Sequence, residues 1–178
     1  SDAASGKLFF SGFANLINAM RKCSRLIVGR IHGKSVGGGV GIAAACDYCF
    51  ATEASDIKLS ELGIGLGPFV IAPALERKMG IAALSELSLE ANSWKTAYWA
   101  QNIALFNSVY ENIRDMDEGM DILTHQLSEY NQEALFEMKK IFWNGTEQWD
   151  SLLQERAVIS GKLVLSDFTK DALSKIKK

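Results

Sequence analysis

The spacing of apolar residues changes several times along the chain, and each change marks a different predicted element. Residues 9–20 place apolar side chains at helical spacing, and residues 26–32 form a β-branched run that predicts a buried strand. Small apolar residues at 40–46 predict a closely packed helix, and residues 48–52 and 56–59 predict two further strands. Strands that alternate with helices indicate an α/β protein with a parallel sheet.

The second half of the chain is richer in predicted helix. A helix is expected between Pro68 and Gly80, which ends it, and a brief strand follows at 105–109. Further on, apolar residues recur at helical spacing among acidic ones, which is typical of amphipathic helices with a solvated face. We therefore divide the chain into a core at 1–114 and a C-terminal helical region at 115–178.

Composition and charge narrow the class of protein. The chain has 178 residues, of which 48% are apolar and 22% charged, the balance of a soluble globular protein. A net charge of −2 argues against nucleic acid as a partner, because a nucleic-acid binder needs a basic surface. The apolar runs are too short to span a bilayer, so a membrane partner is not expected either.

Cysteine and histidine give little support for metal or redox chemistry. Cys46 and Cys49 form a C-x-x-C pair, but no second pair or histidine cluster accompanies them, and Cys23 stands apart. The two histidines, His32 and His125, are far apart in the sequence. We expect no metal site, buried free thiols and a cytoplasmic location.

Two glycine-rich patterns suggest nucleotide chemistry at first sight. Residues 29–35 resemble a phosphate loop, but only three residues separate Gly29 from Gly33 where the motif needs four. Gly39 and Gly41 fit a dinucleotide-binding turn, but the predicted strand ends well before Gly39, whereas such a turn leaves its strand directly. An NAD-dependent oxidoreductase therefore stays a less favoured alternative.

A third interpretation takes the whole stretch in order. The strand leads to Ile31-His32-Gly33, the triplet Gly37-Gly38-Gly39, a small-residue helix, Ala45-Cys46-Asp47, a second strand, Glu61-Leu62-Gly63 and Gly67-Pro68. This order resembles the crotonase superfamily, that of enoyl-CoA hydratases and isomerases, most clearly over residues 26–80. The resemblance implies an α/β spiral of β-β-α turns followed by C-terminal helices. It also implies that the first third of the usual fold is missing here, so we expect more chain, or another chain, to complete the site.

The resemblance assigns the catalytic roles. In this family a backbone N–H stabilises the enolate oxygen of the thioester, and its position here is Gly38, between Gly37 and Gly39. Fixed N–H donors suit this task, and glycine lets the backbone approach the ligand. Family hydratases hold water between two glutamates; the first position is Gly41 here, and the second matches Glu61. One carboxylate suffices to move a proton between carbons, so hydration and isomerisation both stay open.

The same resemblance implies the binding residues, which include Gly37, Gly39 and Gly41. Leu62, Gly63, Pro68 and Phe69 are expected to line the acyl pocket, and the bulk of Phe69 predicts a short or branched acyl group. Lys175 is expected to contact a phosphate of coenzyme A. Coenzyme A arrives with the substrate, so no separate cofactor is expected.

Two expectations concern the protein beyond the reaction. The loss of a glutamate at Gly41 makes a non-catalytic scaffold with the same fold the main alternative to an enzyme. Members of the family form trimers or dimers of trimers through their C-terminal helices, and we expect the same here. Trp143 and Trp149 are expected in the core or at this interface.

Overall fold

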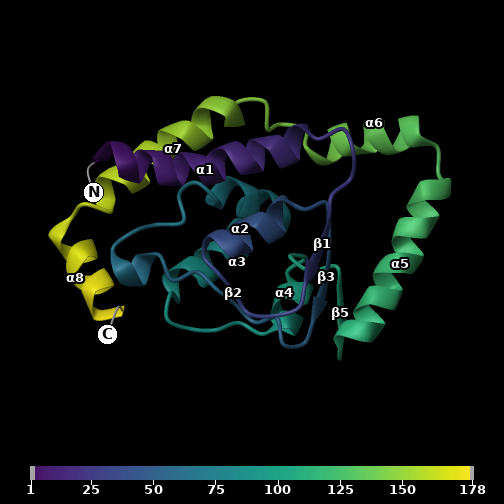
Figure 1. Ribbon diagram of the computed structural model, residues 1–178, viewed down its shortest axis with the longest axis horizontal. Coiled ribbons are helices and arrows are strands. Elements are labelled where there is room, and N and C mark those ends of the chain that lie inside the picture. Colours follow the sequence, from purple (N-terminus) through teal and green to yellow (C-terminus); the bar gives the residue numbers. More distant parts are fainter. Residues whose placement is uncertain (1–2, 177–178) are drawn as a thin grey trace.

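The core of the chain consists of two successive β-β-α turns (Figure 1). The computed structural model describes residues 3–176. The first turn comprises β1 (Val28–Ile31), β2 (Ser35–Val36) and α2 (Gly38–Ala45). The second comprises β3 (Tyr48–Thr52), β4 (Ile57–Lys58), the 3-10 helix η1 (Leu62–Ile64) and α3 (Ala72–Leu89). The predicted α/β class and its β-β-α turns are confirmed.

Corresponding strands of the successive turns lie side by side. The first strands form a parallel sheet in the order β1-β3-β5, where β5 is Ser108–Tyr110, and the second strands form a separate parallel pair, β2-β4. Val36 of β2 lies opposite Lys58 of β4, and the next N–H, that of Gly37, donates to Lys58 O at 2.9 Å. This pairing brings the glycine triplet beside the segment that carries Glu61.

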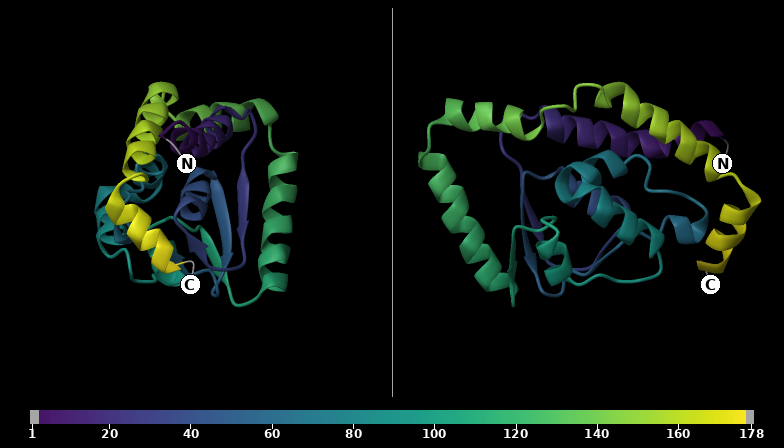
Figure 2. Two further views of the ribbon diagram at one scale, coloured as in Figure 1. Left: turned by 60° about the vertical axis from the view of Figure 1, so that its left-hand side comes forward. Right: turned by 180° about the vertical axis from the view of Figure 1, so that it is seen from behind.

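The remaining helices surround this core (Figure 2). The sheet lies between α2 and α3 on one side and α5 (Ile113–Glu129) on the other, and α1 (Ala3–Lys22) runs beside α7 (Trp149–Leu163). The shorter helices are α4 (Ala97–Asn102), α6 (Gln132–Phe142) and α8 (Asp167–Ile176). Helices α1 and α7 approach closely where Gly161 faces Lys7, since a Cβ atom at position 161 would lie 2.7 Å from Lys7 N.

The start of α3 corrects the sequence-based expectation. The helix begins at Ala72 and not directly after Pro68, because the chain first makes a turn in which Ala72 N donates to Pro68 O at 2.7 Å. The expected helix end at Gly80 is confirmed, since this residue has the non-helical angles φ 78° and ψ 162°, and α3 consists of two helical segments joined at this kink. Met79 and Ala83, one on each side of the kink, pack into the same core, and the second segment ends at Leu89.

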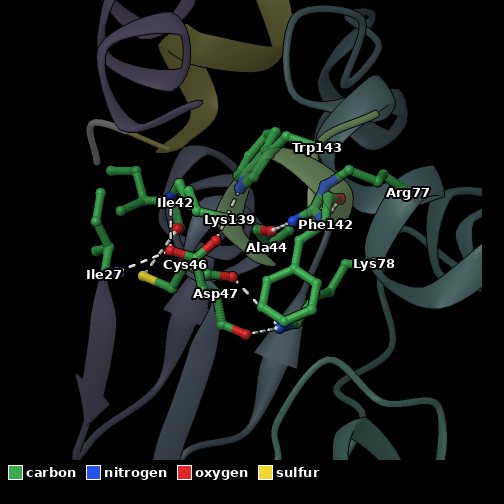
Figure 3. A network of polar contacts seen from close by, with 10 residues as sticks. All are labelled: Ile27, Ile42, Ala44, Cys46, Asp47, Arg77, Lys78, Lys139, Phe142 and Trp143. Carbon is green, nitrogen blue, oxygen red and sulfur yellow. Dashed lines mark hydrogen bonds and ion pairs between the residues drawn. The ribbon is translucent and has the colours of Figure 1, made fainter. Parts of the chain in front are cut away.

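A buried ion pair joins the core to the C-terminal helices (Figure 3). Lys139 Nζ lies 2.5 Å from Asp47 Oδ2, and both side chains are only 3% exposed. The Asp47 carboxylate also accepts the indole N–H of Trp143 at 2.7 Å and the backbone N–H of Ile27 at 2.7 Å. A buried carboxylate with this many donors keeps its charge compensated.

Two further cations gather at the carboxyl end of α2 (Figure 3). Arg77 donates to Ala44 O at 3.3 Å, and Lys78 donates to Cys46 O at 3.3 Å and to Asp47 O at 3.0 Å. Carbonyls at the end of a helix lack partners within the helix and carry partial negative charge. These cations therefore satisfy the carboxyl end of α2 and fix its position against α3.

The tryptophans and cysteines lie inside. Trp143 and Trp149 are each 5% exposed and meet edge to face at 5.8 Å, so of the two places expected for them, the core and a subunit interface, they occupy the core. Cys46 and Cys49 are buried free thiols, and Cys23 is a half-buried one.

The Asp47 carboxylate can be tested by Asp47→Ala. The variant leaves Lys139 Nζ buried without its counter-charge, so we expect the free energy of unfolding to fall by about 3–5 kcal/mol in chemical denaturation. The control is Glu118→Ala, which breaks the exposed pair between Arg114 and Glu118 on α5. There we expect a loss below about 0.5 kcal/mol. Equal losses in the two variants would contradict the role given to the buried pair.

Candidate active site

One small cavity brings together four of the residues singled out in the sequence. Gly38, Glu61, Pro68 and Phe69 line a cavity of about 50 Å³. Further walls come from helices distant in the sequence, through Phe10 and Phe13 of α1, Ser160 of α7 and the loop before α3. Its volume holds only a few water molecules, since each needs about 10–15 Å³.

The amino end of α2 presents free backbone donors at this cavity. Helix α2 begins at Gly38, and the N–H groups of Val40 and Gly41 donate to Gly37 O at 2.9 and 3.2 Å. Within residues 3–176, the N–H groups of Gly38 and Gly39 have no hydrogen-bond acceptor. Unpaired N–H groups at the positive end of a helix favour a negatively charged ligand atom.

Gly37 and Glu61 fit together without room for another side chain. Gly37 has φ 55°, the left-handed region that favours glycine. A Cβ atom at this position would also lie 2.7 Å from Oε1 of Glu61. Glycine is therefore required at position 37 both by its backbone and by the carboxylate beside it.

The carboxylate of Glu61 is held in an apolar environment. Its Oε2 atom is buried and has no hydrogen-bond partner among the described residues. Burial raises the pKa of Glu61 above its usual 4.5, and the backbone N–H of Glu61 itself opposes this more weakly. A carboxyl with a raised pKa is suited to both accepting and donating a proton near neutral pH.

No second carboxylate can be added at position 41 without repacking. Gly41 lies inside α2, and a Cβ atom there would overlap the side chain of Ile71. Ile71 also lines the cavity. The absence of an acid at this position is thus matched by a bulky neighbour.

Of the expected binding residues, Pro68 and Phe69 line this cavity and the others do not. Leu62 is 43% exposed and lines a shallow depression beside Glu90. Gly63 borders the same depression and also a larger groove of about 630 Å³, which Lys175 of α8 lines on another side. Gly39 faces Ser35, whose Cβ atom would lie 3.8 Å from an added side chain.

Several cavity residues could not be predicted from the sequence. Phe10, Phe13, Ile71 and Ser160 reach Glu61 only through the packing of α1, α7 and the loop before α3. Phe13 takes the space that a side chain at Gly38 would need. The apolar pattern of α1 places Phe10 and Phe13 on one face of the helix, but it does not show which segments this face contacts.

Residues 3–176 contain no cluster of three or more histidine, cysteine, aspartate or glutamate side chains able to hold a metal ion.

Substitution at Gly41 tests the packing behind Glu61. Gly→Ala in a helix normally raises the free energy of unfolding by about 0.5–1 kcal/mol. For Gly41→Ala we expect instead a loss of about 1–3 kcal/mol, because the new methyl group overlaps Ile71. Gly12→Ala is the control, since Gly12 is exposed on α1 with no atom within 4 Å of an added Cβ, and it should show the normal gain. A higher free energy of unfolding in both variants would contradict the close packing at position 41.

The burial of Glu61 predicts a pH-dependent difference between the wild type and Glu61→Gln. Because the pKa of Glu61 is higher in the folded chain than its usual 4.5, ionisation favours unfolding. The contribution of Glu61 to the free energy of unfolding is therefore complete below pH 4.5, where its carboxyl is neutral. This contribution is lost as the pH rises through the pKa of the folded chain. We expect the melting temperature of Glu61→Gln to lie above that of the wild type at about pH 8. This difference in melting temperature should disappear towards about pH 4. A difference in melting temperature that grows towards acid pH would contradict the raised pKa of Glu61.

The chain is similar in sequence to known enoyl-CoA enzymes. The sequence profile of the enoyl-CoA hydratase/isomerase family matches residues 2–170. The peroxisomal Delta(3,5)-Delta(2,4)-dienoyl-CoA isomerase of Arabidopsis thaliana is 23% identical over 163 residues, which are 89% of this chain and 57% of the isomerase. The enoyl-CoA hydratase AKT6-1 of Alternaria alternata is 35% identical over 68 residues, covering 38% of this chain and 23% of the hydratase.

Solved structures agree on the fold. The crystal structure of an enoyl-CoA hydratase from Mycobacterium avium superposes with a TM-score of 0.91 at 23% identity, covering 98% of this chain and 68% of the hydratase. The chain spans little more than half the length of the Arabidopsis isomerase. Because the family profile matches nearly the whole chain and the fold agrees, the chain belongs to the enoyl-CoA hydratase/isomerase family of the crotonase superfamily.

Proposed function

We propose that this chain carries the acid/base site of an acyl-CoA enzyme that moves protons at an enoyl-CoA by way of a thioester enolate. The main observation behind the proposal is that Glu61 and Gly38, whose N–H group is free, line the same cavity. A proton acceptor and an oxyanion donor are the two groups that enolate chemistry requires.

Each group has a defined part in the proposed reaction. In a double-bond shift, the Glu61 carboxylate removes a proton from C2 of a 3-enoyl thioester, and the electron pair moves to the thioester oxygen. The N–H of Gly38, at the positive end of α2, stabilises the resulting oxyanion. The protonated Glu61 then returns the proton to C4, which gives the 2-enoyl thioester.

The groove beside η1 is the proposed site for the coenzyme A part of the substrate. Lys58 and Lys175 both line it, and so does Ser60, the residue before Glu61. Two ammonium groups around a groove of about 630 Å³ suit the phosphates of coenzyme A. No separate cofactor is part of this proposal.

The size and walls of the cavity support a short or branched acyl group. Phe10, Phe13 and Phe69 line a space of about 50 Å³ and are all only half-buried. Rotation of these rings gives room for a small acyl group, whereas a long chain requires a wider displacement of α1.

The exposed apolar surface supports assembly as a homotrimer or a dimer of trimers. Large apolar side chains on the C-terminal helices remain exposed, among them Ile122, Ile141, Val158 and Phe168, at 61%, 64%, 48% and 66%. Apolar surface of this kind is usually covered by another protein. We keep the cytoplasm as the proposed compartment; among residues 3–176, no helix is both long and apolar enough to cross a membrane.

The alternatives have less support. Gly41 lies inside α2 and not in a turn that leaves a strand, which disfavours a dinucleotide-binding turn. A non-catalytic scaffold would leave the raised pKa of Glu61 without a use, and it is distinguished by the following experiment.

The proposal is tested with short and branched 2-enoyl-CoA and 3-enoyl-CoA in deuterium oxide, read by mass spectrometry. We expect the wild type to incorporate deuterium at carbon or to add water. Glu61→Gln should lower the rate by about 10²–10⁴-fold, because it removes the only acid/base group that we assign. Glu118→Gln, on the exposed surface of α5, is the control and should keep full activity. Unchanged substrates in the wild type, or full activity in Glu61→Gln, would argue for the scaffold.

A further inference from the structure

Ser160 places a hydroxyl group on the buried face of α7. That face consists of Trp149, Leu153, Ala157, Ser160 and Gly161, and Ser160 is 1% exposed. Its neighbours on this face make apolar or backbone contacts, so a polar side chain is unexpected there. The cavity that Glu61 lines is the space beside it.

The hydroxyl of Ser160 has no hydrogen-bond partner within residues 3–176. A serine in a helix usually donates to a carbonyl of the preceding turn, as Ser151 of the same helix does to Gln148 O at 3.1 Å. Buried polar groups are nearly always paired, with protein or with ordered water. Ser160 therefore lacks the protein partner that its burial calls for.

Glu61 Oε2 is in the same situation on the same cavity. Both oxygens are buried and unpartnered among the described residues, and both residues line the space of about 50 Å³. A buried water needs about 10–15 Å³ and two to four polar partners. The cavity meets both conditions, since it offers the hydroxyl, the carboxylate and the free N–H of Gly38.

The position of Ser160 is fixed by its neighbour in the sequence. Gly161 packs directly on α1, where a Cβ atom would lie 2.7 Å from Lys7 N. This contact sets both the depth and the rotation of α7 at Ser160. A group held so firmly can orient a small nucleophile, for which a misplacement of 1 Å costs about 10²-fold in rate.

We propose that Ser160 and Glu61 together hold the water that is added to the enoyl double bond. Ser160 takes the part for which position 41 has no room, and the site is thereby a hydratase with one carboxylate. This inference rests on the proposed function and decides between its two reactions.

Glu61 carries the proton through the proposed addition of water. Ser160 holds the water oxygen beside C3 while the Glu61 carboxylate accepts one of its protons. The oxygen forms a bond to C3, the C2–C3 double bond becomes single, and its electron pair moves to the thioester oxygen beside Gly38. Protonated Glu61 then gives its proton to C2, which yields the 3-hydroxyacyl thioester and restores the carboxylate.

The test compares Ser160→Ala with the wild type in the complete protein, on short 2-enoyl-CoA and 3-enoyl-CoA. We expect kcat for hydration to fall by about 10²-fold with little change in KM. The double-bond shift of 3-enoyl-CoA needs no water, so its kcat should fall much less than that of hydration. Ser160→Thr keeps a hydroxyl and should retain most hydration, and Ser151→Ala should change neither reaction.

The outcomes separate the inference from the proposed function. Equal hydration by Ser160→Ala and the wild type overturns the role of Ser160, as does a wild type that shifts the double bond but adds no water. In both cases the proposed function stands. A wild type that acts on neither thioester overturns the proposed function, and the inference with it.

Thermal unfolding of Ser160→Ala gives a reading that does not depend on activity. If the hydroxyl bonds a held water, its removal lowers the melting temperature or leaves it unchanged. If the hydroxyl is truly unpaired, its removal relieves a penalty and raises the melting temperature by about 2–4 °C. A rise therefore contradicts the inference.

Discussion

The ion pair of Asp47 and Lys139 is the interaction on which the rest of the structure depends. It joins the loop after α2 to α6, two segments 92 positions apart, and it does so where both charges are nearly inaccessible to water. Two charges in such a place are tolerated only when each is well hydrogen-bonded. With Arg77 and Lys78 at the same end of α2, the negative end of this helix is fully occupied, and its unpaired end is the one that faces Glu61.

Glycine at three positions leaves the space that neighbouring side chains of the site occupy. Glycine at 37 makes room for the Glu61 carboxylate, glycine at 38 for the ring of Phe13, and glycine at 41 for Ile71. The result is a small space whose walls are apolar and whose few polar atoms stand out. In such surroundings each hydrogen bond and each charge is stronger than in water, and each unpaired polar atom is more costly.

Local sequence patterns were sufficient for the central elements. The strand expected at 48–52 has those bounds in the structure, and the one expected at 26–32 is Val28–Ile31. The start of α3 was wrong because a turn at Pro68 and the helix after it share the same apolar composition. Glu61 and Gly38 could be singled out because a family pattern marks them. Ser160 could not be singled out, because no local pattern marks a serine on a helix. Its role depends on the cavity that it forms with three other segments.

The contact between α1 and α7 links the outer packing of the protein to the width of its cavity. Gly6 lies against Gly161, where a Cβ atom at position 6 would be 3.1 Å from Gly161 O, so any larger residue at either place forces the helices apart. Phe13 lies on one of these helices and Ser160 on the other, and both residues line the same cavity. The spacing of α1 and α7 therefore sets the width of this cavity. A larger residue at a remote glycine changes that width while every residue that lines the cavity stays the same.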